Sequence, residues 1–139
     1  MQAQAQAQKP QCLIETTQSN TYGCHALAFE PCDPESQKQQ WRQTDVFTLR
    51  NAKTNSCLDM FRQTDDVHAC PCHSDDNQRW ASLPNGRLQS TFNNQKCLGY
   101  QDVAGTLSPT VRGCYHIHLS YHNHSTDCRV YKPHHRVYL

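Results

Sequence analysis

The fold is decided by residues 57–80, which read CLDMFRQTDDVHACPCHSDDNQRW. This stretch holds three signals in order: Cys-Leu-Asp, an apolar strand-like segment that leads to a cysteine, and Gln-x-Trp. Residues 12–41 repeat the order from Cys-Leu to Gln-x-Trp, and residues 97–114 repeat its first two parts. Because the signals return at intervals of 39 to 45 residues, we infer that one supersecondary unit is used three times.

The size and charge of the chain restrict the class of protein. Its 139 residues suit one domain with a single core. The 13 Lys and Arg residues nearly balance the 12 Asp and Glu residues, so we expect no nucleic-acid partner and no attraction to anionic membranes. The longest apolar runs are far shorter than the roughly 20 residues that cross a bilayer, so we also expect no membrane insertion. The oligomeric state stays open.

Nine cysteines in a chain rich in Asn, Gln and Thr favour an oxidising compartment in which they pair. We therefore expect a secreted or extracellular protein. The alternative is a cytosolic chain with metal-binding thiols, which the lack of a Cys-x-x-Cys motif disfavours. Met1 leads directly into Gln-Ala alternation without an apolar signal segment, so we expect a mature or engineered form.

The alternation of apolar and turn-forming segments predicts an all-β domain after a short tail. Residues 1–10 are a polar tract that we expect to be a disordered leader or linker, and residues 11–139 form the predicted domain. In this domain, apolar segments of three to six residues are separated by Asn, Ser, Thr, Gly, Asp and Pro, without a sustained helical period. We place strands at 46–50, 56–60, 66–70 and 78–81 in the second unit, and at 86–90 in the third.

Two leucines fix the register of the repeat. Leu49 lies eight residues after Trp41, and Leu88 lies eight residues after Trp80. The predicted repeats are therefore about 11–45, 46–84 and 85–126, followed by a C-terminal strand within 127–139. Three units of four strands, each too small to bury its own apolar face, are expected to close into a threefold barrel with a hairpin cap.

The recurring motifs resemble those of the ricin B-chain type of lectin domain, a β-trefoil. The resemblance rests on Cys-Leu-Asp, the strand that leads to the next cysteine, and the two Gln-x-Trp motifs at 39–41 and 78–80, and it spans about residues 12–125. It implies that Trp41 and Trp80 are buried core residues rather than ligand contacts. The third repeat, which has no Gln-x-Trp, is expected to be degenerate.

The same resemblance implies a disulfide within each repeat, pairing Cys12 with Cys32, Cys57 with Cys72 and Cys97 with Cys114. Cys24, Cys70 and Cys128 remain. An odd count leaves at least one thiol free or intermolecular, and Cys24 or Cys70 could displace one of the implied partners.

The repeat pattern breaks at both ends of the chain. The first unit lacks a first strand, since only alanines stand where Leu49 and Leu88 stand in the other units. The last unit has His-Asn-His at 122–124 in place of Gln-x-Trp, and Val130 follows this slot at the offset of those leucines. One hypothesis is that the C-terminal segment supplies the missing strand and closes the barrel as a circular permutation would. The other is a ragged third lobe.

The resemblance to ricin-type domains also implies a shallow sugar pocket. In such a pocket the sugar is held by a carboxylate, by a polar residue and an aromatic platform on the third strand of the repeat, and by an Asn-Gln pair. A carboxylate suits paired sugar hydroxyls, and an aromatic face covers the C–H side of the ring. The second repeat matches with Asp59, His68, Asn77 and Gln78. Its platform slot is Cys70, which cannot stack, and His68, His73 or Phe61 could substitute.

The predicted carbohydrate site is therefore in the second repeat, and galactose-type or related glycans are the ligands that the resemblance implies. Ile14 and Glu30 occupy the carboxylate and platform slots of the first repeat, and Gly99 occupies the carboxylate slot of the third, so neither matches the pattern. The structural alternative for the second repeat is that Asp59 and Asn77 cap turns while Gln78 bonds to the backbone.

Histidines at alternate positions form a second concentrated feature. On a strand, His116, His118, His122 and His124 would share one face and could bind Zn²⁺ or Cu²⁺ or gain charge below about pH 6.5. The plainer interpretation is the polar outer face of a half-buried strand. Asn123 begins an Asn-His-Ser sequence that accepts N-glycosylation in secreted proteins.

No catalytic motif or cofactor-binding loop is recognised, so we predict a protein that is not an enzyme and needs no cofactor. Its predicted partners are glycans or glycoproteins. One alternative function is a degenerate lectin-shaped module for protein interaction, such as a piece of a receptor ectodomain. A third class is a histidine-rich protein that responds to metal or pH.

Overall fold

The computed structural model describes residues 10–20, 22–64, 66–84 and 86–114, and the backbone of 128–131 and 136–138. It consists of short strands and two 3-10 helices, which confirms the all-β prediction. The elements are β1 (Gln11–Ser19), β2 (His25–Pro31), η1 (Gln37–Gln39), β3 (Trp41–Gln43), β4 (Leu49–Asn51), β5 (Cys57–Met60), β6 (Val67–Cys70), η2 (Asp76–Gln78), β7 (Trp80–Ser82), β8 (Leu88–Ser90), β9 (Lys96–Val103), β10 (Thr106–Gly113), β11 (Cys128–Tyr131) and β12 (Arg136–Tyr138). Within the described residues, no helix is long and apolar enough to cross a membrane.

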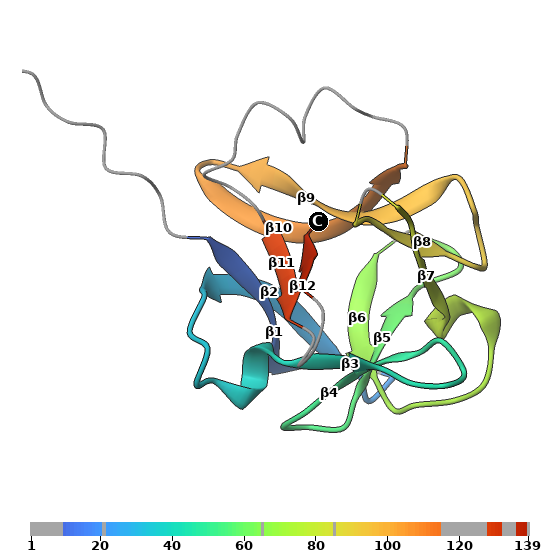
Figure 1. Cartoon of the computed structure of the whole chain (residues 1–139), viewed down its shortest axis with the longest axis horizontal. Helices are drawn as coiled ribbons and strands as arrows, with labels where there is room; N and C mark the ends of the chain where they lie inside the picture. The colour runs from blue at the N-terminus through green and yellow to red at the C-terminus, as the bar shows by residue number, and fades with distance from the viewer. Residues whose placement is uncertain are drawn as a thin grey trace, which may run out of the picture.

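The strands form two curled sheets. One has the order β12-β11-β1-β2-β6-β5-β4-β3, and the other has the order β10-β9-β8-β7. The hairpins β1–β2, β5–β6 and β9–β10 lie on three sides of the molecule (Figure 1). Each comes from one sequence repeat, so the threefold use of one unit is visible in the arrangement of the hairpins.

The two Gln-x-Trp motifs make the same hydrogen bonds in their own repeats. The side-chain amide of Gln39 donates to the carbonyl of Pro31 (3.0 Å), and its oxygen accepts from the backbone N–H of Asp33 (2.7 Å). Gln78 donates to Pro71 (3.0 Å) and accepts from His73 (2.8 Å) in the same way. Gln39 therefore ties the end of β2 to η1, and Gln78 ties the segment after β6 to η2. Each 3-10 helix comes directly before its tryptophan.

The core lies where the repeats meet. Trp41 and Trp80 are fully buried, and their indole N–H groups donate to the carbonyls of Leu13 (2.9 Å) and Leu58 (3.1 Å). The apolar residues around them come from all three repeats and include Leu13, Leu49, Leu58, Met60, Val67, Ala69, Leu88, Leu98 and Val111. The tryptophans thus occupy the core positions that the family resemblance implied.

Four disulfides are formed in the described residues. Three join Cys12 to Cys32, Cys57 to Cys72 and Cys97 to Cys114, which are the pairs that the resemblance implied within each repeat. The fourth joins Cys24 to Cys70, so these two cysteines pair with each other and displace no partner. It links the first and second repeats across a separation of 46 residues, which is worth about 4 kcal/mol in the chain-entropy treatment.

The C-terminal segment lies at the edge of the first repeat. Strand β11 pairs with β1 through Gln11 opposite Cys128 and Cys12 opposite Arg129, and β12 pairs with β11. The pairing of β11 with β1 is parallel, whereas β4 with β5 and β8 with β9 are antiparallel. The segment therefore covers the edge where the first strand is missing, but β11 runs opposite to a permuted first strand, so that part of the closure hypothesis is wrong.

Two equivalent hairpin tips have different residues at their last position, Phe47 in one and Gly86 in the other, which gives a stability prediction. The backbone N–H of Phe47 donates to the carbonyl of Thr44 (3.1 Å), and that of Gly86 donates to the carbonyl of Leu83 (2.9 Å). Both residues have a positive φ, 67° for Phe47 and 85° for Gly86. Phe47 is 58% exposed, so its ring gains little from packing. We expect Phe47→Gly to raise the free energy of unfolding by about 0.5 to 1 kcal/mol in urea titrations, because glycine adopts this backbone without strain.

The matched change at the other tip has the opposite sign. Gly86→Ala places a Cβ at positive φ and should lower the free energy of unfolding by about 1 kcal/mol. A loss of stability in Phe47→Gly would contradict the prediction and would mean that the phenyl ring stabilises the hairpin.

Candidate functional site

A cavity of about 500 Å³ opens between the first and second repeats. Its walls come from the β1–β2 turn, from β5 and the turn after it, and from the segment that runs from the end of β6 into η2. The residues that line it are Tyr22, Cys24, Asp59, Phe61, Arg62, Gln63, Cys70, Pro71, His73 and Asn77. Three of the five predicted sugar-site residues are thus brought together here, namely Asp59, His73 and Asn77.

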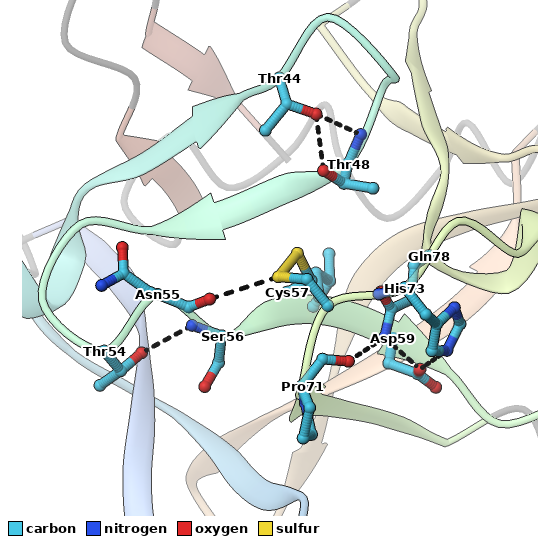
Figure 2. Close-up of a disulfide and its surroundings, with 12 residues drawn as sticks. Thr44, Thr48, Thr54, Asn55, Ser56, Cys57, Asp59, Pro71, His73 and Gln78 are labelled. Atoms are coloured by element: carbon cyan, nitrogen blue, oxygen red, sulfur yellow. Dashed lines mark hydrogen bonds and ion pairs between the residues drawn. A yellow bond between two sulfur atoms is a disulfide. The ribbon is translucent and has the colours of Figure 1, made fainter.

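Asp59 is the centre of the polar wall. It lies on β5 and is 4% exposed, with its carboxylate held by two amide groups. Asn77 Nδ2 donates to Asp59 Oδ1 (3.2 Å) and Gln78 Nε2 donates to Asp59 Oδ2 (2.8 Å). A carboxylate has about four acceptor positions, so these two bonds and a contact with His73 do not use all of them. Figure 2 shows that Gln78 and His73 both contact this carboxylate, in each case at Oδ2.

The two amides of the Asn-Gln pair have different roles. Gln78 is fully buried and does not line the cavity; it joins Asp59 to the backbone of Pro71 and His73. Asn77 lines the cavity, and its amide also donates to the carbonyl of Met60 (3.2 Å). Gln78 therefore orients the carboxylate, while Asn77 forms part of the wall.

Only one of the two predicted histidines reaches the cavity. The side chain of His73 is 41% exposed, and its Nε2 lies 3.4 Å from Asp59 Oδ2. His68 stands opposite Asp59 in the β5–β6 register, but it packs against Phe61, with ring centroids 4.7 Å apart and planes at 77°. Its Nδ1 is buried without a hydrogen-bond partner among the described residues. His68 thus supports an aromatic neighbour and does not line the cavity.

The aromatic lining comes from outside the expected platform slot. Cys70, in that slot, is bonded to Cys24, and both line the cavity. Phe61 lines the cavity as well, and the edge-on ring of Tyr22 contacts it at a centroid distance of 5.6 Å and an interplanar angle of 62°. Phe61 was among the residues expected to replace the platform, whereas Tyr22 was not predicted. The signal that could have found it is its position two residues before a cysteine that had no partner within its repeat.

Arg62 also lines the cavity and was not predicted from the sequence. Its guanidinium lies 4.6 Å from the centre of the Phe92 ring, and its Nη2 donates to Asp76 Oδ1 (2.6 Å). The same nitrogen lies 3.4 Å from Asn77 Oδ1. These contacts fix Arg62 at the cavity wall with its charge already paired by a carboxylate.

The equivalent slots of the other repeats are filled differently. In the first repeat, Gln39 Nε2 donates to Glu30 Oε1 (2.8 Å), so a carboxylate from β2 takes the place that Asp59 on β5 has in the second. In the third repeat, the position of a Cβ on Gly99 lies 3.9 Å from the side chain of Arg112. Neither arrangement repeats the polar wall around Asp59.

A second cavity, of about 460 Å³, lies beside Glu15, Thr16, Thr17, His25, Lys38, Asn51, Lys53 and Thr54. The Glu15 carboxylate bonds to His25 Nδ1 (2.7 Å), to Ser56 Oγ (3.0 Å) and to the hydroxyl of Thr54. The bonds to Ser56 and Thr54 cross from the β1–β2 hairpin to the turn before β5. They help to hold the first repeat in a fixed position against the second.

The remaining predicted sites fall on other parts of the chain. His116, His118, His122 and His124, and the sequon at Asn123, lie outside the described residues. Among the residues that are described, no group of three or more His, Cys, Asp or Glu side chains is placed to hold a metal ion.

Comparisons with solved structures place this fold among known proteins. The chain is similar to the mdaA-1 domain, with a TM-score of 0.62, 16% identity, and coverage of 74% of this chain and 72% of that one. It is also similar to the β-trefoil lectin of the Vibrio vulnificus hemolysin/cytolysin with N-acetyl-D-lactosamine bound, with a TM-score of 0.58, 16% identity, and coverage of 79% and 81%. At such identities these likenesses show the fold, and the predicted β-trefoil is confirmed.

A third similar structure is GalNAc-T7 with UDP, GalNAc and Mn²⁺, with a TM-score of 0.59 and 18% identity. The match covers 75% of this chain but 18% of that one, so the chain spans less than a fifth of that protein. No curated protein is found to match the chain by sequence. The family model of the ricin-type beta-trefoil lectin domain matches residues 2–119, which is most of the chain. The chain therefore belongs to the ricin-type β-trefoil lectin domain family.

Proposed function

We propose that this domain binds carbohydrate through the cavity of its second repeat and catalyses no reaction. The observation that carries the proposal is the position of Asp59, a buried carboxylate in a cavity wall that also contains Asn77, an exposed imidazole and aromatic rings. Membership of the lectin family supports carbohydrate as the class of ligand. The first and third repeats, which have Ile14 and Gly99 at the carboxylate position, are not part of the proposed site.

The wall offers what an uncharged sugar ring requires. Asp59 accepts from a ring hydroxyl with its remaining acceptor position. His73 Nδ1 already accepts from the backbone N–H of Asp75 (3.1 Å), so Nε2–H is the ring donor for a ligand hydroxyl. Asn77 Oδ1 accepts from a neighbouring hydroxyl, because both hydrogens of its Nδ2 are donated to Asp59 and Met60. Gln78 keeps the carboxylate in place without contacting the ligand, and His68 supports the site through its ring contact with Phe61. The ligand class that we propose is galactose-type or a related neutral sugar.

The local charge favours a neutral sugar over an acidic one. Asp59 lines the cavity, Asp75 and Asp76 contact the lining residues His73 and Arg62, and Arg62, the one arginine in the lining, is paired with Asp76. An anionic group on the ligand would meet these carboxylates in a partly desolvated site, where repulsion is weakly screened. A single site of this kind binds a monosaccharide with about 4 kcal/mol, a millimolar Kd, so clustered ligands or clustered copies would supply avidity.

The proposed setting is extracellular. Four disulfides in the described residues persist most readily in an oxidising compartment. Glycans and glycoproteins on cell surfaces or in secretions are the partners that such a domain would meet. Glycosylation of the domain itself at Asn123 belongs to the same proposal.

A glycan array on oxidised protein, followed by calorimetric titration with galactose and N-acetyl-D-lactosamine, tests the proposal. Asp59→Ala should raise Kd at least about tenfold, since it removes a charged acceptor. His73→Ala should raise Kd by a smaller factor, about threefold to tenfold, and its exposed side chain makes a loss of folding less of a concern.

The first repeat offers matched controls. Glu30→Ala removes the carboxylate that Gln39 contacts. Asp33→Ala changes the residue whose backbone N–H donates to Gln39, as that of His73 donates to Gln78. Neither change should alter Kd. Binding that is unchanged in Asp59→Ala and His73→Ala would remove the proposed site. Absence of binding to every glycan would favour the alternative of a lectin-shaped module for protein interaction.

A further inference from the structure

We propose that Tyr22, from the first repeat, is the stacking face of the sugar site in the second repeat, and that the Cys24–Cys70 disulfide holds it there. The inference rests on the proposed function and adds the residue that determines which ring face the site can cover. It makes the site composite, because the hydrogen-bonding groups and the aromatic face come from different repeats.

The turn that carries Tyr22 is folded around one asparagine. Asn20 Oδ1 accepts from the backbone N–H groups of Tyr22 (2.9 Å) and Cys24 (3.0 Å), and Asn20 N donates to the carbonyl of Cys24 (2.8 Å). Gly23 takes a φ of +75°, which lets the chain reverse between Tyr22 and Cys24. The backbone of Tyr22 is therefore fixed by bonds that do not involve its ring.

The disulfide anchors this turn on the second repeat. Strand β2 pairs with β6 through His25 opposite Ala69 and Ala26 opposite His68, so the next pair in the register is Cys24 opposite Cys70. Their Cα atoms are 4.2 Å apart, and both residues are buried. Since Cys70 lines the cavity in the strand-three platform slot, the bond brings the turn of the first repeat to the place where the second lacks an aromatic ring.

The Tyr22 ring is the one best placed to meet a ligand. Tyr22 is 74% exposed as a residue and still lines the cavity. Phe61, the other aromatic in the lining, is half-buried between edge-on contacts with Tyr22 and His68. Phe61 thus braces Tyr22 from one side and leaves most of the phenol open. Aromatic faces gain most from covering the C–H side of a sugar ring when their position is fixed beforehand.

The alternative is that Tyr22 is an exposed turn residue whose ring contacts Phe61 and nothing else. The two possibilities differ in what the disulfide does for binding. If Tyr22 stacks on the ligand, the loss of the disulfide weakens binding through Tyr22 alone, and the two changes are not additive. If Tyr22 is an ordinary surface residue, neither change alters binding of galactose.

Calorimetric titration of the full oxidised chain with galactose and N-acetyl-D-lactosamine tests this coupling. Tyr22→Ala should raise Kd roughly tenfold, and Tyr22→Phe should stay within about twofold of the parent, because the ring face is kept. The double variant Cys24→Ser and Cys70→Ser should raise Kd by a factor similar to that of Tyr22→Ala. Adding Tyr22→Ala to the double variant should produce little further change.

The disulfide of the third repeat gives a matched control. Cys97→Ser with Cys114→Ser removes a bond outside the cavity, so it should lower stability without changing Kd below its melting temperature. Saturation-transfer NMR should show the galactose C–H protons close to the Tyr22 ring in the parent, and this signal should fall in the Cys24→Ser, Cys70→Ser variant.

Three outcomes would overturn different parts of the proposal. If Asp59→Ala abolishes binding and Tyr22→Ala leaves it unchanged, the inference about Tyr22 is overturned and the proposed site stands. If Tyr22→Ala weakens binding and its effect is additive with that of the double serine variant, the role of the disulfide is overturned. If neither Asp59→Ala nor Tyr22→Ala affects binding, both the proposed site and the inference fall.

Discussion

Trp80→Ala should lower the free energy of unfolding by about 3 to 5 kcal/mol, the largest loss that we expect from truncating one core residue. The indole is fully buried among apolar side chains of several strands, and its N–H donates to the Leu58 carbonyl at 3.1 Å. Truncation removes buried apolar area, leaves a cavity and deprives a buried carbonyl of its donor. Urea unfolding of the oxidised protein, followed by circular dichroism, measures the change.

The repeat supplies an internal comparison for this prediction. Trp41→Ala should cost a similar amount, because Trp41 is equally buried and donates to Leu13 in the same way. An exposed aromatic residue provides the control: Phe47→Ala should change the free energy of unfolding by less than about 1 kcal/mol. A large loss for Trp41 with a small one for Trp80 would contradict the equivalence of the two repeats.

Gln78→Glu should lower the free energy of unfolding at pH 7 by about 3 kcal/mol or more. The amide nitrogen of Gln78 donates to Asp59 Oδ2 (2.8 Å) and to the Pro71 carbonyl (3.0 Å). Glutamate replaces this donor with a carboxylate oxygen. That oxygen, Asp59 Oδ2 and the Pro71 carbonyl are then three buried acceptors with no hydrogen between them. Two carboxylates this close cannot both stay ionised. The folded variant must therefore take up a proton that the unfolded chain does not bind at neutral pH.

The sign of the pH dependence follows from that proton. A carboxyl group that holds its proton more tightly when folded stabilises the protein at low pH, and this stability is lost as the pH rises above the usual carboxyl range of about 4. The deficit of Gln78→Glu relative to the parent should therefore shrink on acidification from pH 7 towards pH 4. Urea titrations at several pH values measure it.

Gln39→Glu is the matched control, because Gln39 makes the same contact with Glu30 at 2.8 Å. Glu30 is only partly buried, so its carboxylate can turn towards water, and we expect a smaller deficit with a weaker pH dependence. A deficit in Gln78→Glu that stays constant between pH 4 and pH 7 would contradict a shared proton at Asp59.

Features that depend on the repeat itself could be predicted from the sequence. The spacing from Trp41 to Leu49 and from Trp80 to Leu88 places each leucine on the strand after its tryptophan, and both leucines are in the core. The expected strands at 56–60 and 66–70 lie within one residue of β5 and β6. Local turn chemistry and the apolar period determine these elements, and both can be read from adjacent residues.

Features that depend on how the repeats meet could not be predicted in the same way. The repeat shows that residues in different units are equivalent but gives no distance between units, so the pairing of Cys24 with Cys70 and the arrival of Tyr22 at the cavity stayed hidden. Which side chains from other segments contact a strand residue is also decided by the tertiary structure. His68 occupies the expected position opposite Asp59, yet the Phe61 ring covers it.

The disulfide between the first two repeats has a consequence for the chain as a polymer. A backbone cut between residues 33 and 56, for instance after the exposed Lys53, separates the sequence into two fragments. Among the disulfides of the described residues, Cys24–Cys70 is the one that spans such a cut. A nicked molecule therefore stays a covalent pair of chains until it meets a reductant, and its amino-terminal piece cannot diffuse away.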